Sequence, residues 1–215
     1  MTMNEKFPQN EPSIEDYTDE EVFQNYMEDL KLSPEDFDKK ILDVGSGSSQ
    51  FAKWAKEHSV SSQIFSLESK QESQEKTKSV RGVAEAIPFQ EEAFDLVISN
   101  ASIPNVFLGE RQEIVREKIK NSLFELMRVT KPGGEIRLGR VLKGEIYETQ
   151  KAFVSALDET LHELQQTYGA EIEEIPYPVA NTYEYVNHEP VKLLAKAYLI
   201  RIRKQANFQH AKPTE

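Results

Sequence analysis

The sequence predicts an α/β fold with a doubly wound, mostly parallel sheet, helices on both faces and an antiparallel last strand. Two observations lead to this prediction. Short apolar runs that end in polar or glycine-containing turns alternate with longer segments whose apolar residues recur every three or four positions. Residues 94–99 are also almost continuously apolar, which is typical of a strand buried on both faces.

The first segments of the chain are read from composition and capping signals. Residues 1–15 lack apolar periodicity and contain two prolines, so we expect a disordered tail. Residues 16–38 are expected to form two cap helices, because Thr18 and Glu21 give a capping-box pattern and Ser33 precedes Pro34. A single domain is predicted over residues 16–205.

The rest of that domain divides into a core and a carboxyl-terminal part. The core, residues 40–141, is predicted to contain strands at 41–44, 63–68, 80–83, 94–99 and 135–141, with helices after residue 50, at 69–78 and at 110–129. Residues 142–205 should add a helix ending near Gly169 and strands at 171–175 and 196–203. Residues 206–215 are expected to be a flexible tail.

Charge and composition limit the function. A net charge of −11 disfavours nucleic acid as a partner, because affinity for phosphate backbones depends on clustered lysine and arginine. The absence of cysteine excludes disulfides, thiolate metal ligands and a cysteine nucleophile, and no metal site is predicted. No membrane span or secretory signal is recognisable, so we expect a cytoplasmic protein; its oligomeric state is open.

The strongest chemical signal is the segment Ile-Leu-Asp-Val-Gly-Ser-Gly at residues 41–47. Two glycines between a strand and a helix allow a tight bend and close approach of a ligand to the backbone. A dinucleotide-binding turn would continue to a third glycine where Gln50 stands. Because Asp43 at the strand end would repel a pyrophosphate and attract a cation, the pattern favours an ammonium or sulfonium ligand over a nicotinamide dinucleotide.

These residues and three later segments resemble the class I S-adenosylmethionine-dependent methyltransferases, in particular their small-molecule, type 11 branch. The later segments are Gly-Val-Ala-Glu-Ala-Ile-Pro-Phe at 82–89, Phe-Asp-Leu-Val-Ile-Ser at 94–99 and Arg-Val-Thr-Lys-Pro-Gly-Gly at 128–134. The resemblance covers residues 40–141 and implies a Rossmann-like sheet and S-adenosyl-L-methionine as cofactor. It implies cofactor contacts at Asp43, Gly45, Ser46, Gly47, Glu68, Ala84, Glu85, Asn100 and Ala101, with Glu68 on the ribose hydroxyls and the Ala84 N–H on adenine.

Two positions depart from the family pattern. Ser49 replaces a third glycine, and Val83 replaces the acid that contacts the adenine amino group, a contact that Glu85 is placed to take over. The function predicted is therefore methyl transfer to an unidentified small molecule or protein side chain, the small molecule being favoured. The alternative is a catalytically degenerate protein of the same fold with a binding or regulatory role.

The motifs identify no catalytic residue, because the cofactor itself supplies the reactivity. Among the histidines His188 is the one candidate for a base; His58 and His162 fall on helix surfaces and His210 in the tail. Tyr17, Tyr183 and Tyr185 are candidates for contact with the substrate, although packing roles explain them equally well. Asn100 is followed by Ala-Ser-Ile instead of the Pro-Pro of amino-methylating nucleic-acid enzymes, which also favours a small acceptor.

Overall fold

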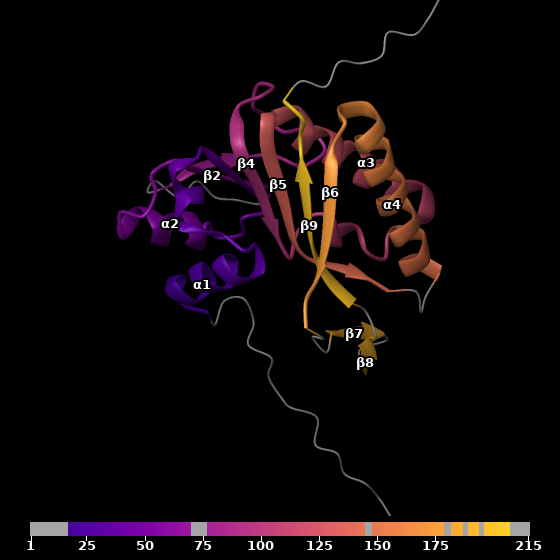
Figure 1. Ribbon diagram of the computed structural model, residues 1–215. Helices are drawn as coiled ribbons and strands as arrows, with labels where there is room; N and C mark the ends of the chain where they lie inside the picture. Colours follow the sequence, from indigo (N-terminus) through magenta and orange to yellow (C-terminus); the bar gives the residue numbers. More distant parts are fainter. Residues whose placement is uncertain are drawn as a thin grey trace, which may run out of the picture.

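A computed structural model describes residues 17–69, 77–144, 148–178, 182–186, 189–193 and 196–206 of the chain. The expected tails lie outside this part, except for Ala206, and so do His188 and His210. Seven strands form one sheet in the order β3-β2-β1-β4-β5-β9-β6 (Figure 1). Their bounds are β1 Ile41–Val44, β2 Ile64–Glu68, β3 Lys78–Arg81, β4 Phe94–Asn100, β5 Thr130–Lys143, β6 Glu171–Pro176 and β9 Lys196–Arg203.

Neighbouring strands from β3 to β5 run parallel, whereas β9 is antiparallel to both β5 and β6. The predicted mostly parallel sheet with an antiparallel last strand is therefore confirmed. Because parallel neighbours end at the same edge, the carboxyl ends of β1, β2, β4 and β5 lie together there. This edge carries the glycine turn after β1.

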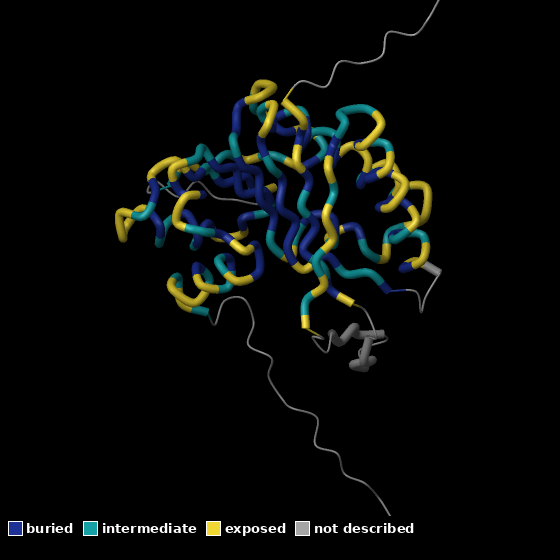
Figure 2. Tube along the Cα trace, viewed as in Figure 1, coloured by how far each residue is buried: buried dark blue, intermediate teal, exposed yellow. Residues whose placement is uncertain are grey.

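Helices cover both faces of the sheet, as predicted. The helices are α1 (Asp19–Asp29), η2 (Pro34–Asp38), α2 (Gln50–Glu57), η3 (Asn105–Phe107), α3 (Gln112–Val129) and α4 (Glu148–Tyr168), η marking a short 3-10 helix. Within β1, Ile41 packs into the cluster with α1 and α2, while its neighbour Leu42 packs into the cluster with α3 and α4. This alternation follows the two-residue period of a strand, and Figure 2 shows the buried sheet between the exposed outer faces of the helices.

The start of α1 confirms the predicted capping box. The Thr18 hydroxyl accepts a hydrogen bond from the Glu21 N–H at 3.2 Å, and the Glu21 carboxylate accepts one from the Thr18 N–H at 2.8 Å. Both interactions satisfy N–H groups that a helix start leaves unpaired. The second predicted helix is only the single 3-10 turn η2, with Pro34 at its first position.

Packing against α2 holds α1 over the glycine turn. The Phe23 ring stacks on Trp54 with centroids 4.1 Å apart, and Tyr26 stacks on Phe51 at 4.4 Å. The side-chain amide of Gln50 donates to the Tyr17 carbonyl at 3.1 Å. Gln50, which argued against a dinucleotide-binding turn on sequence grounds, thus ties the segment before α1 to the start of α2.

Three details differ from the sequence-based expectations. The third strand is Lys78–Arg81 instead of 80–83, because a tight Val83–Ala86 bridge follows it and takes Val83 out of the sheet. The helix expected at 69–78 is wrong at its end, since Lys78 pairs with Phe65 of β2; residues 70–76 lie outside the described part. The antiparallel pair β7 (Thr182–Val186) and β8 (Glu189–Leu193), between β6 and β9, was not predicted.

No helix in the described ranges is both long enough and apolar enough to span a membrane.

Candidate cofactor site

The turn after β1 needs glycine for two separate reasons. Gly45 and Gly47 both have left-handed backbones, with φ of 76° and 55°. The N–H of Gly45 donates to the Leu67 carbonyl at 2.8 Å, which fastens the turn to β2. A Cβ at Gly45 would lie 2.0 Å from Ser102 Oγ, whereas one at Gly47 would meet nothing within 4 Å. Gly45 is thus required by close packing, and Gly47 leaves an open space beside the backbone.

Glu68, at the end of β2, faces this turn. Its Oε2 accepts a hydrogen bond from the Gly47 N–H at 3.1 Å, and its Oε1 accepts from the Ser69 N–H at 2.7 Å. The carboxylate therefore links the ends of β1 and β2 and remains partly exposed. A carboxylate in this position can accept hydrogen bonds from hydroxyl groups of a ligand that lies across the two strand ends.

A hollow of about 530 Å³ opens beside Glu68, and we call it the Glu68 hollow. It is lined by Val44, Gly45, Leu67, Glu68, Ser69, Gly82, Val83, Ala84, Glu85, Ser102, Ile103, Val106, Phe107 and Lys118. Val83 and Val106 are exposed to 46% and 56%, and among the described residues they are the exposed large hydrophobic side chains. Because exposed apolar groups that gather at a hollow mark binding surfaces, this lining fits a flat apolar ring next to a polar group at Glu68.

A second hollow, of about 310 Å³, lies on the other side of Gly45, and we call it the Arg140 hollow. It is lined by Tyr17, Val22, Asn25, Tyr26, Asp29, Gly45, Ser46, Gly47, Ser48, Gln50, Asn100, Ala101 and Arg140. The two hollows share Gly45, and the Ser102 hydroxyl stands over that residue. A ligand that extends from one hollow into the other would therefore pass close to Gly45 and Ser102.

Asp43 lines neither hollow. Its carboxyl group is fully buried, and Oδ1 accepts a hydrogen bond from the Tyr26 hydroxyl at 3.4 Å. Burial, opposed by this hydrogen bond and reinforced by the negative charge of Glu68, raises the pKa of Asp43 to about 8. A pKa of about 8 favours the protonated, neutral form of Asp43 at neutral pH in the free protein. The sequence led us to expect that a charged Asp43 would attract a cation directly, and the enclosed neutral group does not do this.

Unpaired polar atoms collect under the glycine turn. Buried side-chain atoms without a partner in the described part include Asp43 Oδ2 and Ser66 Oγ, within β1 and β2, and Ser46 Oγ and Asn100 Oδ1, whose residues line the Arg140 hollow. Buried polar groups are nearly always hydrogen-bonded, so the unpaired groups of Ser46 and Asn100 at this hollow suit a polar ligand. Together with the open backbone at Gly47 and the apolar rim at Val83, this donor and acceptor set fits an S-adenosylmethionine-like molecule.

The described hollows bring most of the expected site residues together. Glu68, Ala84 and Glu85 line the Glu68 hollow; Ser46, Gly47, Asn100 and Ala101 line the Arg140 hollow; and Gly45 lines both. Their contacts with a cofactor stay predictions. Tyr17 lines the Arg140 hollow, whereas the side chains of Tyr183 and Tyr185 and all of His188 lie outside the described part. His58 and His162 are exposed on α2 and α4, as expected.

Asp29, Ser102 and Arg140 are lining residues that sequence reasoning missed. Asp29 accepts from the Asn100 side-chain amide at 3.0 Å and from Arg140 Nε at 2.6 Å. Asp29 and Arg140 come from α1 and β5, and Ser102 follows β4, so no local spacing in the sequence joins the three residues. Ser102 was visible only as part of the segment after β4, and nothing there signalled its contact with Gly45.

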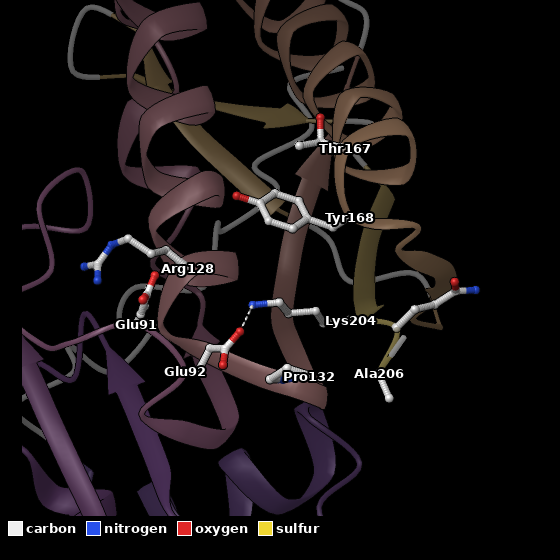
Figure 3. A pocket seen from close by; sticks show the side chains of 9 residues that line it. Glu91, Glu92, Arg128, Pro132, Thr167, Tyr168, Lys204 and Ala206 are labelled. Carbon is white, nitrogen blue, oxygen red and sulfur yellow. Dashed lines mark ion pairs between the residues drawn. The ribbon is translucent and has the colours of Figure 1, made fainter. Parts of the chain in front are cut away.

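Another hollow, of about 290 Å³, lies at the opposite end of β4 and β5 (Figure 3). Its Lys204 amino group donates to the carbonyls of Met127 and Thr130 at 3.1 and 2.9 Å and pairs with Glu92 at 3.7 Å. The lysine thereby satisfies carbonyl groups that are left unpaired at the end of α3. The lysine therefore has a structural role.

Comparisons with known proteins agree with this geometry. The sequence profile of the family described as methyltransferase domain matches residues 42–138. A comparison with curated proteins finds no match. Among solved structures, YcgJ of Bacillus subtilis is similar with a TM-score of 0.53 and 16% identity, over 84% of this chain and 99% of that one.

Two further structures share the fold at low identity. BH2331 of Bacillus halodurans has a TM-score of 0.51 and 13% identity, over 85% of this chain and 98% of its own. The [4+2]-cyclase SpnF has a TM-score of 0.55 and 16% identity, over 88% and 81% respectively. Residues 42–138 of this chain thus match the methyltransferase domain family, which confirms the class I, type 11 resemblance that the motifs from Asp43 to Gly134 predicted.

Proposed function

We propose that this chain transfers the methyl group of S-adenosyl-L-methionine to a small-molecule acceptor, with a protein side chain as the second acceptor class. The observation that carries the proposal is the pair of hollows that meet at Gly45, one beside Glu68 and the other beside Asn100. A nucleoside joined to an amino-acid tail needs such a divided site, with apolar flanks and hydroxyl acceptors on one side and polar groups on the other.

In this proposal the Glu68 hollow takes the nucleoside. Glu68 accepts the ribose hydroxyls, Val83 and Val106 flank the adenine ring, and the Ala84 N–H reaches its edge. Glu85, in the same lining, is the group available to the adenine amino nitrogen in place of the acid that Val83 replaces. The methionine tail then runs across Gly45 toward Ser46 and Asn100.

Bound cofactor supplies an electrophilic methyl group on a sulfonium, and the chain supplies alignment of the acceptor and exclusion of water. The Arg140 hollow is the place for the acceptor, because α1 covers it with Tyr17, Val22 and Tyr26. Asp29 is the carboxylate among its lining residues, so it is the described group that can orient or accept a proton from an acceptor hydroxyl or amine.

Calorimetric titration with S-adenosylmethionine and S-adenosylhomocysteine tests cofactor binding directly. We expect saturable binding of both ligands and a rise in melting temperature with ligand concentration. No heat and no thermal shift at millimolar ligand would refute the proposal. Incubation of the protein with a metabolite extract and isotopically labelled donor then tests transfer, with the product expected as a methyl-sized mass gain.

The second candidate is a protein of this fold that no longer transfers methyl groups. Val83 supports it, because the replaced acid would cost a charged hydrogen bond worth about 1.5–3 kcal/mol. SpnF also supports it in a general way, since a structure with the same fold is described as a cyclase, and a fold does not determine a reaction. Ser49 counts against it, because its φ of 59° keeps the left-handed turn that glycine would adopt. Binding of the donor without any labelled product in the extract would favour this candidate.

A further inference from the structure

Arg140 has an unusual backbone for its residue type. Its φ of 52° lies in the left-handed region, which glycine adopts at a lower energetic cost than arginine. The pairing of β5 with β9 shifts register between Leu138 and Val141, so Gly139 and Arg140 form a bulge. A bulge redirects the side chain of the strand, and strained residues that a structure retains are often found at functional positions.

Side chains from two other segments hold this bulge in place. The Asn105 amide donates to the Arg140 carbonyl at 2.8 Å, and its oxygen accepts from the Leu142 N–H at 3.0 Å. The Arg140 N–H donates to the Tyr177 hydroxyl at 3.4 Å, and that hydroxyl in turn donates to the Asp29 carbonyl. The conformation is therefore fixed by its surroundings, independently of any ligand.

The guanidinium group is anchored at one end and open at the other. Its Nε donates to Asp29 Oδ2 at 2.6 Å, and Asp29 is itself buried and bonded to Asn100. Within the described residues neither terminal nitrogen, Nη1 or Nη2, makes a hydrogen bond. The Arg140 side chain is 51% exposed and lines the hollow under α1, in which Arg140 and Asp29 are the charged residues.

We propose that Arg140 binds a carboxylate of the acceptor, so that the substrate of this chain is a small carboxylic acid. The planar pair of free N–H groups matches the two oxygens of a carboxylate, and anchoring by Asp29 reduces the entropy lost when that pair is held. Tyr17, Val22 and Tyr26 provide apolar surface for the body of the acid. This inference rests on the proposed function, because the bound carboxylic acid is a substrate only if the chain transfers methyl groups.

Two carboxylates have access to Arg140 in this hollow, the one on the acceptor and the methionine carboxylate of the cofactor. The Glu68 hollow lies at β1, β2 and β4, and Arg140 stands on β5, one strand beyond β4 in the sheet (Figure 1). An anion on Arg140 would thus lie at the side of its hollow away from the nucleoside. Both sources share carboxylate chemistry, so the experiment must separate them.

Calorimetric titration of the full chain with benzoate, and with benzamide as a neutral isostere, provides the test. We expect benzoate to bind and benzamide to bind at least tenfold more weakly. Arg140→Gln should weaken benzoate binding at least tenfold, with S-adenosylhomocysteine affinity unchanged within twofold. Arg140→Lys, which keeps a positive charge beside Asp29 but lacks the planar pair, should give an intermediate loss. Arg116→Gln is the matched control, because Arg116 is similarly exposed on α3 and paired with Glu159.

Each result decides the proposal. Equal affinity for benzoate and benzamide, absence of benzoate binding, or unchanged benzoate binding by folded Arg140 variants would overturn it. A tenfold loss of S-adenosylhomocysteine affinity in Arg140→Gln, with competition between that ligand and benzoate, would assign the arginine to the cofactor and overturn it as well. Benzoate binding is measured on the ligand-free protein and does not depend on S-adenosylhomocysteine. Failure of S-adenosylhomocysteine to bind would therefore count against the proposed function and not against the role of Arg140.

Discussion

The Tyr26 hydroxyl of α1 donates a hydrogen bond to the buried Asp43 carboxyl group of β1, with 3.4 Å between the two oxygens. The contact joins the covering helix to the strand that carries the glycine turn. It pairs one oxygen of the enclosed Asp43 carboxyl group, whereas the other oxygen has no partner in the described part of the chain. The ionisation of Asp43 should therefore influence the stability of the site and its cover.

Asp43→Asn should make the unliganded protein less sensitive to pH. The folded-state pKa of Asp43, about 8, exceeds its value of 3.8 in an unfolded chain. Stability from this group is thus fully present below pH ~4 and is lost as the pH rises to about 8, at up to about 1.4 kcal/mol per pH unit. The free energy of unfolding of the variant relative to wild type, from urea denaturation at several pH values, should rise across that interval.

Tyr26→Phe is the matched variant for this prediction. Removal of the hydroxyl deletes the hydrogen bond that favours ionised Asp43, so the pKa of Asp43 should rise further and the pH-dependent loss should extend to higher pH. A constant difference between Asp43→Asn and wild type from pH ~4 to ~8 would show that Asp43 is not protonated in the folded protein.

Glu68→Gln should weaken binding of every ligand that carries the ribose. The neutral amide cannot accept two hydroxyl donors as a carboxylate does, and loss of a charged hydrogen bond costs about 1–3 kcal/mol. S-adenosylhomocysteine and 5′-methylthioadenosine should lose affinity equally in calorimetry, because both contain the ribose. Glu57→Gln, at the exposed end of α2, removes the same charge and should leave both affinities unchanged. Retained affinity in Glu68→Gln would mean that the ribose lies elsewhere.

Arg128→Met should loosen one wall of the Glu68 hollow without touching a ligand. Arg128 donates to the carbonyls of Ile87 and Phe89, each at 2.9 Å, and pairs with Glu125, whose carboxylate accepts from the Ile87 N–H. These bonds hold the segment that continues from Ala84. We expect a loss of about 1–3 kcal/mol in the free energy of unfolding and weaker binding of 5′-methylthioadenosine.

Arg116→Met is the control for this prediction, since its exposed pair with Glu159 should contribute less than about 1 kcal/mol. If Arg128→Met lowers stability and leaves nucleoside affinity intact, the clamp is structural and does not position the wall.

Local signals account for what the sequence predicted. The strand and glycine turn at 41–47, the apolar strand at β4 and the capping box at Thr18 each depend on a few consecutive residues, and each is confirmed. Glu68 was identified through the resemblance to the methyltransferase family, which places an acid at the end of the second strand. Its contact with Gly47 then follows from the register of β1 and β2.

Features that depend on distant segments escaped prediction. The enclosure of Asp43 depends on Tyr26 and on how α1 packs over the sheet, and the orientation of Arg140 depends on Asn105, Tyr177 and Asp29. The sequence around Arg140 is an ordinary strand pattern, so nothing in it indicates that this residue has a left-handed backbone. The β7–β8 pair was likewise missed.

Ser49 offers a test of the turn that needs no ligand. Its φ of 59° is left-handed, and its hydroxyl lies 3.3 Å from that of Ser79, so Ser49→Gly and Ser49→Ala lose the same hydroxyl. The left-handed conformation costs a residue with a Cβ roughly 1–2 kcal/mol, partly offset by the greater unfolded-state entropy of glycine. We expect Ser49→Gly to exceed Ser49→Ala by about 1 kcal/mol in free energy of unfolding, measured by urea denaturation. At Ser155, exposed within α4, the order should reverse, because alanine favours a helix over glycine by about 1 kcal/mol. An alanine variant at position 49 as stable as the glycine variant would show that the turn is not left-handed in solution.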